Sequence, residues 1–477
     1  MAGSSALSAV LAACAAPVPA PTAAPAATMA PAAAPTTAAG AKPTEAPKPA
    51  TAPAAATPTP AVSTKPASGT AVTLGLWLIQ LSPDQDKLFR EKVVDPFKAK
   101  AANLAFDLQY TTWSNVQEKV LASMAGGVAP DIFQSAPQWT PLFIGKTGKE
   151  NLLAIDSYLA TWEGTKDFYD NVMSSVKMRG KTWGLPYGAD TRAILYRKDV
   201  FKDAGLDPEK PPTTWQEFVD AAVKCTKRSG DQFDRAGYNA IPGGDFNRGQ
   251  QWVSFFYQAG GEYFNEDMSQ VLWNSEPGVR ALQLLVDLVN VQKVCPLGGM
   301  PAGATPAEDP FITGKLAIQD GSIGGLFNFK RYAPDKLSQL GFGNPLKDVK
   351  QLMFLGGNSL HIWSGTKHKD ESWTGLSYLV SPEPIAAYGE AVNSPTTRIS
   401  VNDTAPYMKA DPLLQAFARA GQYGRTVPTV PGGQQLSKFL NDNIDAAGRK
   451  LMTVKQALDD ATQKANTALA QAAKANQ

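Results

Sequence analysis

GKTWGLPYGADTRAILYRKDVFKDAGLDPEKPPTTWQEFVDAAVKCT runs from Gly180 to Thr226 and carries the strongest local fold signal in the chain. A bend rich in glycine and proline leads into the apolar run 193–196 (AILY), which predicts a buried strand. Thr214 and Glu217 then have the spacing of a capping box at the start of a helix that ends near Cys225. A strand that feeds directly into a helix is the repeating unit of an α/β fold.

The chain ahead of this stretch repeats the alternation of strands and helices. Residues 72–78 (VTLGLWL) and 104–110 (LAFDLQY) predict buried strands, and each is followed by a helical pattern. In the second of these helices, Ser114 and Gln117 resemble a capping box. A third short strand is predicted within 126–136 (GGVAPDIFQSA). This order predicts a parallel sheet flanked by helices.

The amino-acid composition changes abruptly at Val72, and about 400 residues follow that point. A single hydrophobic core rarely grows beyond about 250–300 residues. We therefore expect two lobes. The formal net charge is only +2 and no block of Lys or Arg occurs, so we expect no nucleic-acid partner. No stretch approaches the length of about 18 apolar residues that would span a membrane.

Residues 15–71 are predicted to form a disordered linker rich in Ala, Pro and Thr. From Ala15 to Thr70 this segment contains three lysines, one glutamate and no Phe, Trp or Tyr. Proline removes amide donors, and so little apolar surface cannot offset the ordering entropy. Residues 1–14 end in Leu-Ala-Ala-Cys, which resembles a bacterial lipobox and implies lipidation at Cys14. An Ala-rich N-terminus without an anchor is the alternative.

Motifs for catalysis and metal binding are missing from the sequence. The two histidines, His361 and His368, have no cluster of Cys or His around them, and no nucleophile elbow, Walker or dinucleotide glycine pattern occurs. We therefore expect no metal, no cofactor and no enzymatic activity. Cys225 and Cys295 both follow predicted helices, and in an exported protein they are candidates for a disulfide. Two buried free thiols are the alternative.

Aromatic residues are abundant, with 10 Trp, 13 Tyr and 20 Phe. An aromatic ring stacks on the apolar face of a pyranose, and nearby polar groups bind its hydroxyls. Any single aromatic residue can equally belong to the core, but the set as a whole favours a carbohydrate site. Those beside glycines or at predicted strand ends are Trp77, Trp139, Tyr187, Trp252, Tyr257, Phe327 and Trp363.

From Val72 to the C-terminus, the motifs resemble the family 1 extracellular solute-binding proteins, the binding subunits of ABC-type sugar importers. The opening stretch carries the family's Gly-Lys-x-aromatic-Gly-Leu-Pro, Leu-Tyr-x-Lys-Asp and Pro-x-Thr-Trp elements in order. Arg197 stands where the family usually has Asn. Further matching segments are 119–135 (KVLASMAGGVAPDIFQS), 311–322 (FITGKLAIQDGS), 355–383 (LGGNSLHIWSGTKHKDESWTGLSYLVSPE) and 393–398 (NSPTTR).

The resemblance implies a two-lobed α/β fold of the periplasmic-binding-protein type, with hinge crossovers and a ligand cleft between the lobes. Lobe one would comprise 72–189 and 357–396, and lobe two 192–355 and 400–477. The hinges would lie near 189–191, 355–357 and 397–400.

The resemblance also implies a function. The protein would be an extracytoplasmic lipoprotein, tethered to the bacterial cell membrane by lipidated Cys14 and monomeric. It would capture a mono- or oligosaccharide and deliver it to the permease subunits of an ABC importer. Aromatic residues would stack on the sugar, and Gln134, Asp190 and Asn358 would bind its hydroxyls. Strand ends and crossovers give the expected site residues Trp77, Gln134, Ser135, Tyr187, Asp190, Trp252, Tyr257, Phe327, Asn358 and Arg398.

Three other functions stay open at this point. The solute could be a polyamine, a phosphate ester, a peptide or a metal, the protein could be a surface-anchored carbohydrate-active enzyme, or it could be an adhesin or sensor. A basic or acidic cleft would favour a charged solute, and turnover of an oligosaccharide would identify an enzyme.

Overall fold

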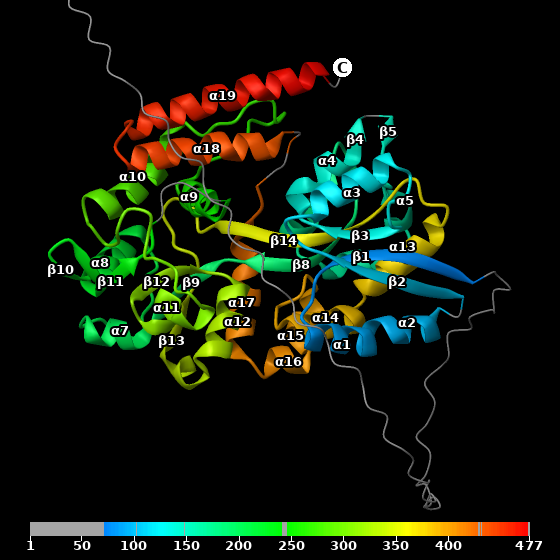
Figure 1. The fold of residues 1–477 in the computed structure, drawn as a ribbon, viewed down its shortest axis with the longest axis horizontal. Coiled ribbons are helices and arrows are strands. Elements are labelled where there is room, and N and C mark those ends of the chain that lie inside the picture. Colours follow the sequence, from blue (N-terminus) through cyan, green and yellow to red (C-terminus); the bar gives the residue numbers. More distant parts are fainter. Residues whose placement is uncertain are drawn as a thin grey trace, which may run out of the picture. The chain divides into compact units, whose positions relative to one another are not determined.

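The structure is a computed structural model that describes residues 71–101, 103–146, 148–240, 246–427, 430 and 432–475. All of them belong to one compact unit, Pro66–Gln477. The predicted signal, Cys14 and all of the predicted linker except Ala71 lie outside the described residues. The described chain forms two large β-sheets with helices packed around each, and two small two-stranded sheets (Figure 1), which agrees with the predicted α/β class.

The first sheet combines strands from distant parts of the chain. Within the described residues it has six strands, in the order β15-β14-β3-β1-β2, and β8 also pairs with β14. β1 is parallel to both β2 and β3, as predicted, whereas β14 runs antiparallel to β3 and β8. The strands are β1 (Val72–Ile79), β2 (Leu104–Thr111), β3 (Ile132–Ser135), β8 (Leu185–Thr191), β14 (Met353–Ile362) and β15 (Gly424–Arg425).

The second sheet has five strands among the described residues, in the order β10-β11-β12-β9-β13. β9 is the predicted AILY strand and pairs antiparallel with both β12 and β13. All five of its residues are buried. The strands are β9 (Ala193–Arg197), β10 (Lys227–Ser229), β11 (Gln232–Tyr238), β12 (Leu316–Gly321) and β13 (Leu340–Gly343).

Two segments that the sequence suggests as crossovers pair with each other. β8 leads into β9 after a single residue, Arg192, so the chain passes there from the first sheet to the second. In β14, Leu355, Gly356 and Gly357 pair with Thr191, Asp190 and Ala189 of β8. The two crossovers are therefore adjacent antiparallel strands, held by one ladder of backbone hydrogen bonds.

Helices cover both sheets (Figure 1). α13 packs on β1 and β14, α8 packs on β11 and β12, and α9 contacts β14, α10 and α18. The helices around the first sheet are α1 (Pro83–Phe89), α2 (Asp95–Lys100), α3 (Val116–Ala125), α4 (Thr140–Ile144), α5 (Asp156–Leu159), α6 (Asp170–Ser174), α13 (Lys369–Leu379) and α14 (Pro382–Val392). The other helices are α7 (Lys198–Asp203), α8 (Trp215–Cys225), α9 (Phe246–Gln258), α10 (Glu276–Asn290), α11 (Pro310–Thr313), α12 (Ile323–Tyr332), α15 (Ile399–Thr404), α16 (Pro406–Lys409), α17 (Pro412–Ala420), α18 (Gly433–Gly448) and α19 (Val454–Ala475).

The predicted helix caps have different outcomes. Thr214 and Glu217 form the reciprocal capping box of α8, as predicted. The box predicted at Ser114 is wrong, because α3 begins at Val116 with Asn115 at the N-cap and no side-chain capping bond. The Ser114 hydroxyl instead hydrogen-bonds the Thr112 hydroxyl at 2.9 Å. Ser114 therefore belongs to the turn after β2 and does not cap α3.

Candidate functional site

A cavity of about 790 Å³ is lined by residues that are far apart in the sequence. The lining includes the turn after β3 at Pro137–Trp139, part of α6, and β14 at Phe354–Gly356. It also includes α9, α18 and the segment Gly424–Val427. Its size and its mixture of apolar and polar side chains are typical of a small-molecule site.

Trp139 is the lining aromatic residue with the most accessible ring. It is half-buried and meets Trp113 edge to face, with ring centroids 6.0 Å apart. Tyr263 and Phe264 also line the cavity, but both are almost completely buried and pack against each other at 5.1 Å. The accessible face of Trp139 can therefore stack on a flat apolar ligand surface.

The charged side chains of the lining are mostly paired. Arg425 forms a two-pronged ion pair with Glu262, in which the Nη1–Oε1 distance is 3.0 Å, and its guanidinium lies 4.7 Å from the ring centroid of Tyr257. The hydrogen bonds from Arg425 lower the pKa of Glu262. Lys438 pairs with Asp442 at 2.6 Å. Lys177 is exposed and forms no ion pair with any described residue.

Uncharged polar groups complete the lining. Gln250 of α9 accepts a hydrogen bond from Arg192 at 2.9 Å, and Arg192 is also paired with Asp190 at 2.6 Å. The amide nitrogen of Asn171 donates to the carbonyls of Gly421 and Gly424, at 3.0 and 2.8 Å. These contacts fix Asn171 and Gln250 at the cavity, so their orientation does not depend on a ligand.

Asp190 is the predicted site residue with the most direct link to this cavity. It sits on β8 opposite Gly356, a lining residue, and Arg192 connects it to Gln250. Asp190 itself and the nine other predicted residues are not among the residues that line the cavity.

Four of the predicted residues lie on neighbouring strands of the first sheet: Gln134, Ser135, Tyr187 and the half-buried Asn358. Gln134, Ser135 and Tyr187 are each at most 1% exposed. Gln134 accepts a hydrogen bond from the backbone amide of Ile79 at 3.0 Å. The side chains of Gln134 and Asn358 both hydrogen-bond the phenol of Tyr388 on α14. The structure thus brings these residues together, but as an internal network.

Trp252, Tyr257 and Arg398 have structural contacts in place of the predicted ligand contacts. Trp252 is fully buried, stacks on Phe256 at 4.7 Å and donates to the Gly278 carbonyl. Tyr257 is fully buried and donates to the Thr426 carbonyl at 3.1 Å. Arg398 is 2% exposed, and its guanidinium donates to the carbonyls of Val380 and Gly164. In this conformation these three side chains are held by contacts within the protein.

Trp77 and Phe327 are half-buried at other places. Trp77 lies on β1, where the ammonium group of Lys119 is 3.9 Å from its ring centroid. Phe327 lies on α12. The remaining pair of predicted residues, Cys225 and Cys295, are buried free thiols, so the expected disulfide is not formed in the structure.

Sequence reasoning missed most of the cavity lining. Trp139 belongs to the aromatic residues noted beside strand ends, and its position after β3 was a usable signal. Asn171, Gln250 and Arg425 carry no local signal, because only the tertiary structure brings α6, α9 and β15 to one cavity. The α18 residues Leu436 and Ser437 are likewise ordinary helix residues in the sequence.

The family model of the bacterial extracellular solute-binding proteins matches residues 92–416. The chain is a bacterial extracellular solute-binding protein. This confirms the resemblance that the motifs indicate. Proteins of this family bind solutes and are not enzymes as a class.

Relatives of this solute-binding protein are named as periplasmic binding proteins. It is 27% identical over 370 residues, covering 75% of this chain and 79% of the other, to the "Probable amino-acid ABC transporter periplasmic-binding protein y4oP" of Sinorhizobium fredii. It is 25% identical over 306 residues to the "sn-glycerol-3-phosphate-binding periplasmic protein UgpB" of Escherichia coli K12, covering 61% and 68% of the two chains.

Solved structures share its fold. The sugar-binding protein MalE from Xanthomonas citri has a TM-score of 0.73 at 22% identity, covering 84% of this chain and 98% of that one. A solute-binding protein from Thermotoga lettingae, bound to α-D-tagatose, has a TM-score of 0.69 at 24% identity, covering 83% and 99%. The predicted two-lobed α/β fold is therefore confirmed.

The described residues of the solute-binding protein contain neither a membrane-spanning helix nor a metal cluster. None of its described helices is long and apolar enough to cross a membrane. Within the same residues, no group of three or more His, Cys, Asp or Glu side chains has the arrangement of a metal site.

Proposed function

We propose that this solute-binding protein captures a carbohydrate in the cavity of about 790 Å³ and delivers it to an ABC importer. The observation that carries the proposal is the combination of an accessible tryptophan ring with uncharged polar groups around one cavity. Trp139 offers the ring, and Gln138, Asn171, Gln250 and Ser437 offer amide and hydroxyl groups. A sugar presents the matching surfaces, an apolar C–H face and a rim of hydroxyls.

The electrostatics of the lining favour an uncharged solute. Arg425 is neutralised by Glu262, and Lys438 by Asp442. To bind an anion with Arg425, the protein would first have to weaken its bonds to Glu262, which costs free energy. A neutral polyol needs no such exchange, since hydroxyl groups can bond to the amides that are already in place.

A phosphate ester is the second candidate. It is favoured by Lys177, an exposed lining cation without an ion pair among the described residues, and by the relatives named for sn-glycerol 3-phosphate. A phosphate dianion would attract Lys177, and its binding would weaken as salt screens the charges. Sugar binding would be insensitive to salt.

A ligand panel tests the two candidates. Purified protein would be titrated calorimetrically with maltose, mannotriose, tagatose, sn-glycerol 3-phosphate and an amino-acid mixture, at low and high NaCl. We expect saturable binding of a sugar with the same affinity at both salt concentrations. Binding of sn-glycerol 3-phosphate alone, weakened by salt, would replace the carbohydrate proposal with the phosphate-ester proposal. Chromatography of the bound oligosaccharides after long incubation would reveal any turnover, which we do not expect.

The remaining features of the function are also proposals. We place lobe one at 72–189 and 357–396 and lobe two at 192–355 and 400–477. A solute that touches both lobes would favour a closed arrangement, which the importer's permease subunits would recognise.

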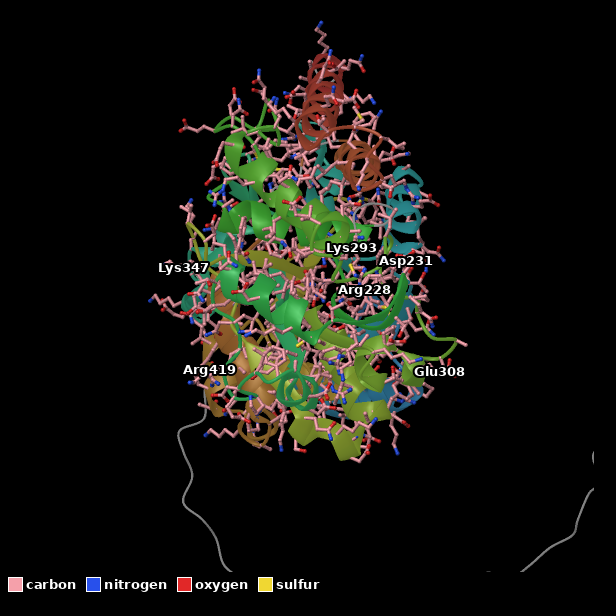
Figure 2. All side chains as sticks on the ribbon, turned by 90° about the vertical axis from the view of Figure 1, so that its left-hand side faces the viewer. Arg228, Asp231, Lys293, Glu308, Lys347 and Arg419 are labelled. Atoms are coloured by element: carbon pink, nitrogen blue, oxygen red, sulfur yellow. The ribbon has the colours of Figure 1, made fainter. Side chains whose placement is uncertain are left out.

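We propose a monomer outside the cytoplasm, held to the cell membrane by lipidated Cys14. On the side of the protein that faces the viewer in Figure 2, exposed charges of both signs occur, among them Arg228, Asp231, Lys293, Glu308, Lys347 and Arg419.

A further inference from the structure

We propose that the two paired strands β8 and β14 hold a small binding site for one hydroxyl group, formed by Tyr187 and Asn358 beside Tyr388. The hydroxyl is that of a trapped water molecule or of the bound solute. The lining of the large cavity includes none of these three residues, but it reaches Gly356 on β14, two residues before Asn358.

The first observation is a buried hydroxyl that lacks a protein partner. Tyr187 is 1% exposed, and its phenol oxygen has no hydrogen-bond partner among the described residues. Burial raises the pKa of Tyr187, so the group stays a neutral O–H donor. A buried donor without a partner costs free energy, and such groups in proteins usually meet an ordered water or a ligand.

The second observation is a buried acceptor on the neighbouring strand. The Oδ1 atom of Asn358 is also buried and has no partner among the described residues. The Asn358 side chain also hydrogen-bonds the phenol of Tyr388. Because its oxygen has no partner, this bond is made by the Asn358 amide nitrogen, which donates to the phenol oxygen. The Asn358 oxygen is therefore left to accept from another group.

The packing brings these groups to one place. The ring of Tyr187 stacks on the ring of Tyr388, with centroids 4.2 Å apart. Asn358 pairs in register with Gly188, the residue after Tyr187. A Cβ on Gly188 would lie 2.6 Å from the Asn358 amide nitrogen, so the glycine keeps this space available for the amide. Tyr187 and Asn358 thus both contact Tyr388 of α14, Tyr187 through its ring and Asn358 through its amide.

The chemistry of the three groups selects the occupant. The occupant must accept a hydrogen bond from the Tyr187 hydroxyl and donate one to the Asn358 oxygen. A hydroxyl group does both, whereas a carboxylate or phosphate oxygen cannot donate and an ammonium group cannot accept. A buried water with two to four polar partners satisfies the same requirement. The solute form of the proposal rests on the proposed carbohydrate function.

The test is the variant Tyr187→Phe, which removes only the hydroxyl. Its melting temperature without ligand and its affinity for maltose and mannotriose would be compared with the parent protein. Tyr257→Phe is the matched control, because the hydroxyl of this buried tyrosine has a partner, the Thr426 carbonyl. The control should lower the melting temperature and so show that the assay detects the loss of one buried hydrogen bond.

Two results support the proposal and distinguish the source of the hydroxyl. If water occupies the site, Tyr187→Phe lowers the melting temperature of the ligand-free protein by about 1–3 °C. The effect is then smaller in an Asn358→Ala background, because both side chains serve the same water. If a sugar hydroxyl occupies it, the melting temperature stays the same or rises, and the affinity falls about tenfold.

One result overturns the proposal. A melting temperature that is unchanged or raised, together with unchanged affinity, means that the Tyr187 hydroxyl bonds to nothing. If the parent protein binds no sugar, the proposed carbohydrate function is wrong. The hydroxyl site is then tested only by the effect of Tyr187→Phe on the melting temperature of the ligand-free protein. A fall then supports the site, and no fall rejects it.

Discussion

Trp139 is the side chain on which the proposed sugar site depends most. Its ring is half-buried at the cavity, and replacing it with alanine removes a stacking surface without opening the core. We expect Trp139→Ala to weaken the binding of the panel's sugar by about 2 kcal/mol, roughly thirtyfold. Calorimetric titration of the folded variant measures this. Full affinity in Trp139→Ala would remove the ring from the proposed site.

Trp252 provides the matched control for Trp139, since both variants lose an indole. Trp252 is fully buried and stacked on Phe256. Trp252→Ala should therefore cost about 3–5 kcal/mol of unfolding free energy. Molecules that remain folded should bind sugar like the parent. The opposite pattern, a stable variant with lost affinity, would restore Trp252 to the ligand site.

His361 makes the stability of the protein depend on pH. It is fully buried on β14, its Nδ1–H donates to the Trp183 carbonyl at 2.8 Å, and its Nε2 accepts from the Ser359 hydroxyl at 2.7 Å. Burial lowers its pKa from 6.5 to about 4. Between these values the unfolded chain binds a proton that the folded protein does not. The stability is therefore complete above pH 6.5 and decreases by about 3 kcal/mol as the pH falls through 4.

Urea unfolding at pH 7, 6 and 5 checks this dependence. Burial raises the pKa of the Asp320 carboxyl, which favours the folded protein as the pH falls. A decrease in stability over this range should therefore come mainly from the histidine. The variant His361→Gln should be less stable at pH 7 but show a flatter pH profile. His368→Gln, at the N-cap of α13, serves as control and should keep the parent's profile. An equal slope in both variants would assign the pH dependence to other groups.

The ladder between β8 and β14 requires a glycine at 357. Gly357 has φ +152°, and a Cβ added there would lie 2.5 Å from the Gly188 carbonyl oxygen. Gly357→Ala must therefore shift one of the two strands. We expect a loss of at least about 1–3 kcal/mol from backbone strain alone, measured by denaturant unfolding.

Gly324 on α12 is a suitable comparison for Gly357. A Cβ at Gly324 would meet only the Ser322 hydroxyl oxygen, at 3.7 Å, and the residue lies in a helix. Gly324→Ala should change the stability by no more than about 1 kcal/mol, towards greater stability, because alanine has the higher helix propensity. If Gly357→Ala is equally harmless, the close approach of the two strands is not needed for folding.

The whole protein is expected to be attached to the membrane through Cys14. Substitution of this residue by alanine should move the protein from the membrane fraction to the soluble fraction of its native host, because a lipid chain supplies the attachment. Immunoblots of the two fractions measure the change. Solute affinity of the purified variant should equal that of the parent. A variant that still sediments with membranes would refute the anchor.

Local chemistry in the sequence was sufficient to predict several strands and helices and the α/β class. The strand at 193–196, the capping box of Thr214 and Glu217 and the parallel strands β1 to β3 depend on neighbouring residues, and the structure contains all of them. The family likewise follows from motifs in a fixed order. The capping-box prediction failed at Ser114, because the Ser114 hydroxyl hydrogen-bonds the nearby Thr112 hydroxyl.

The location of the site, by contrast, was decided by tertiary structure. Trp252 is fully buried and Trp139 is only half-buried. Neither the composition nor the local pattern of the sequence distinguishes a tryptophan of the first kind from one of the second. The cavity joins the turn after β3 to α9 and α18, which are more than 100 and almost 300 residues farther along the chain. Such contacts form through burial between distant segments, and no spacing rule within one segment contains that information.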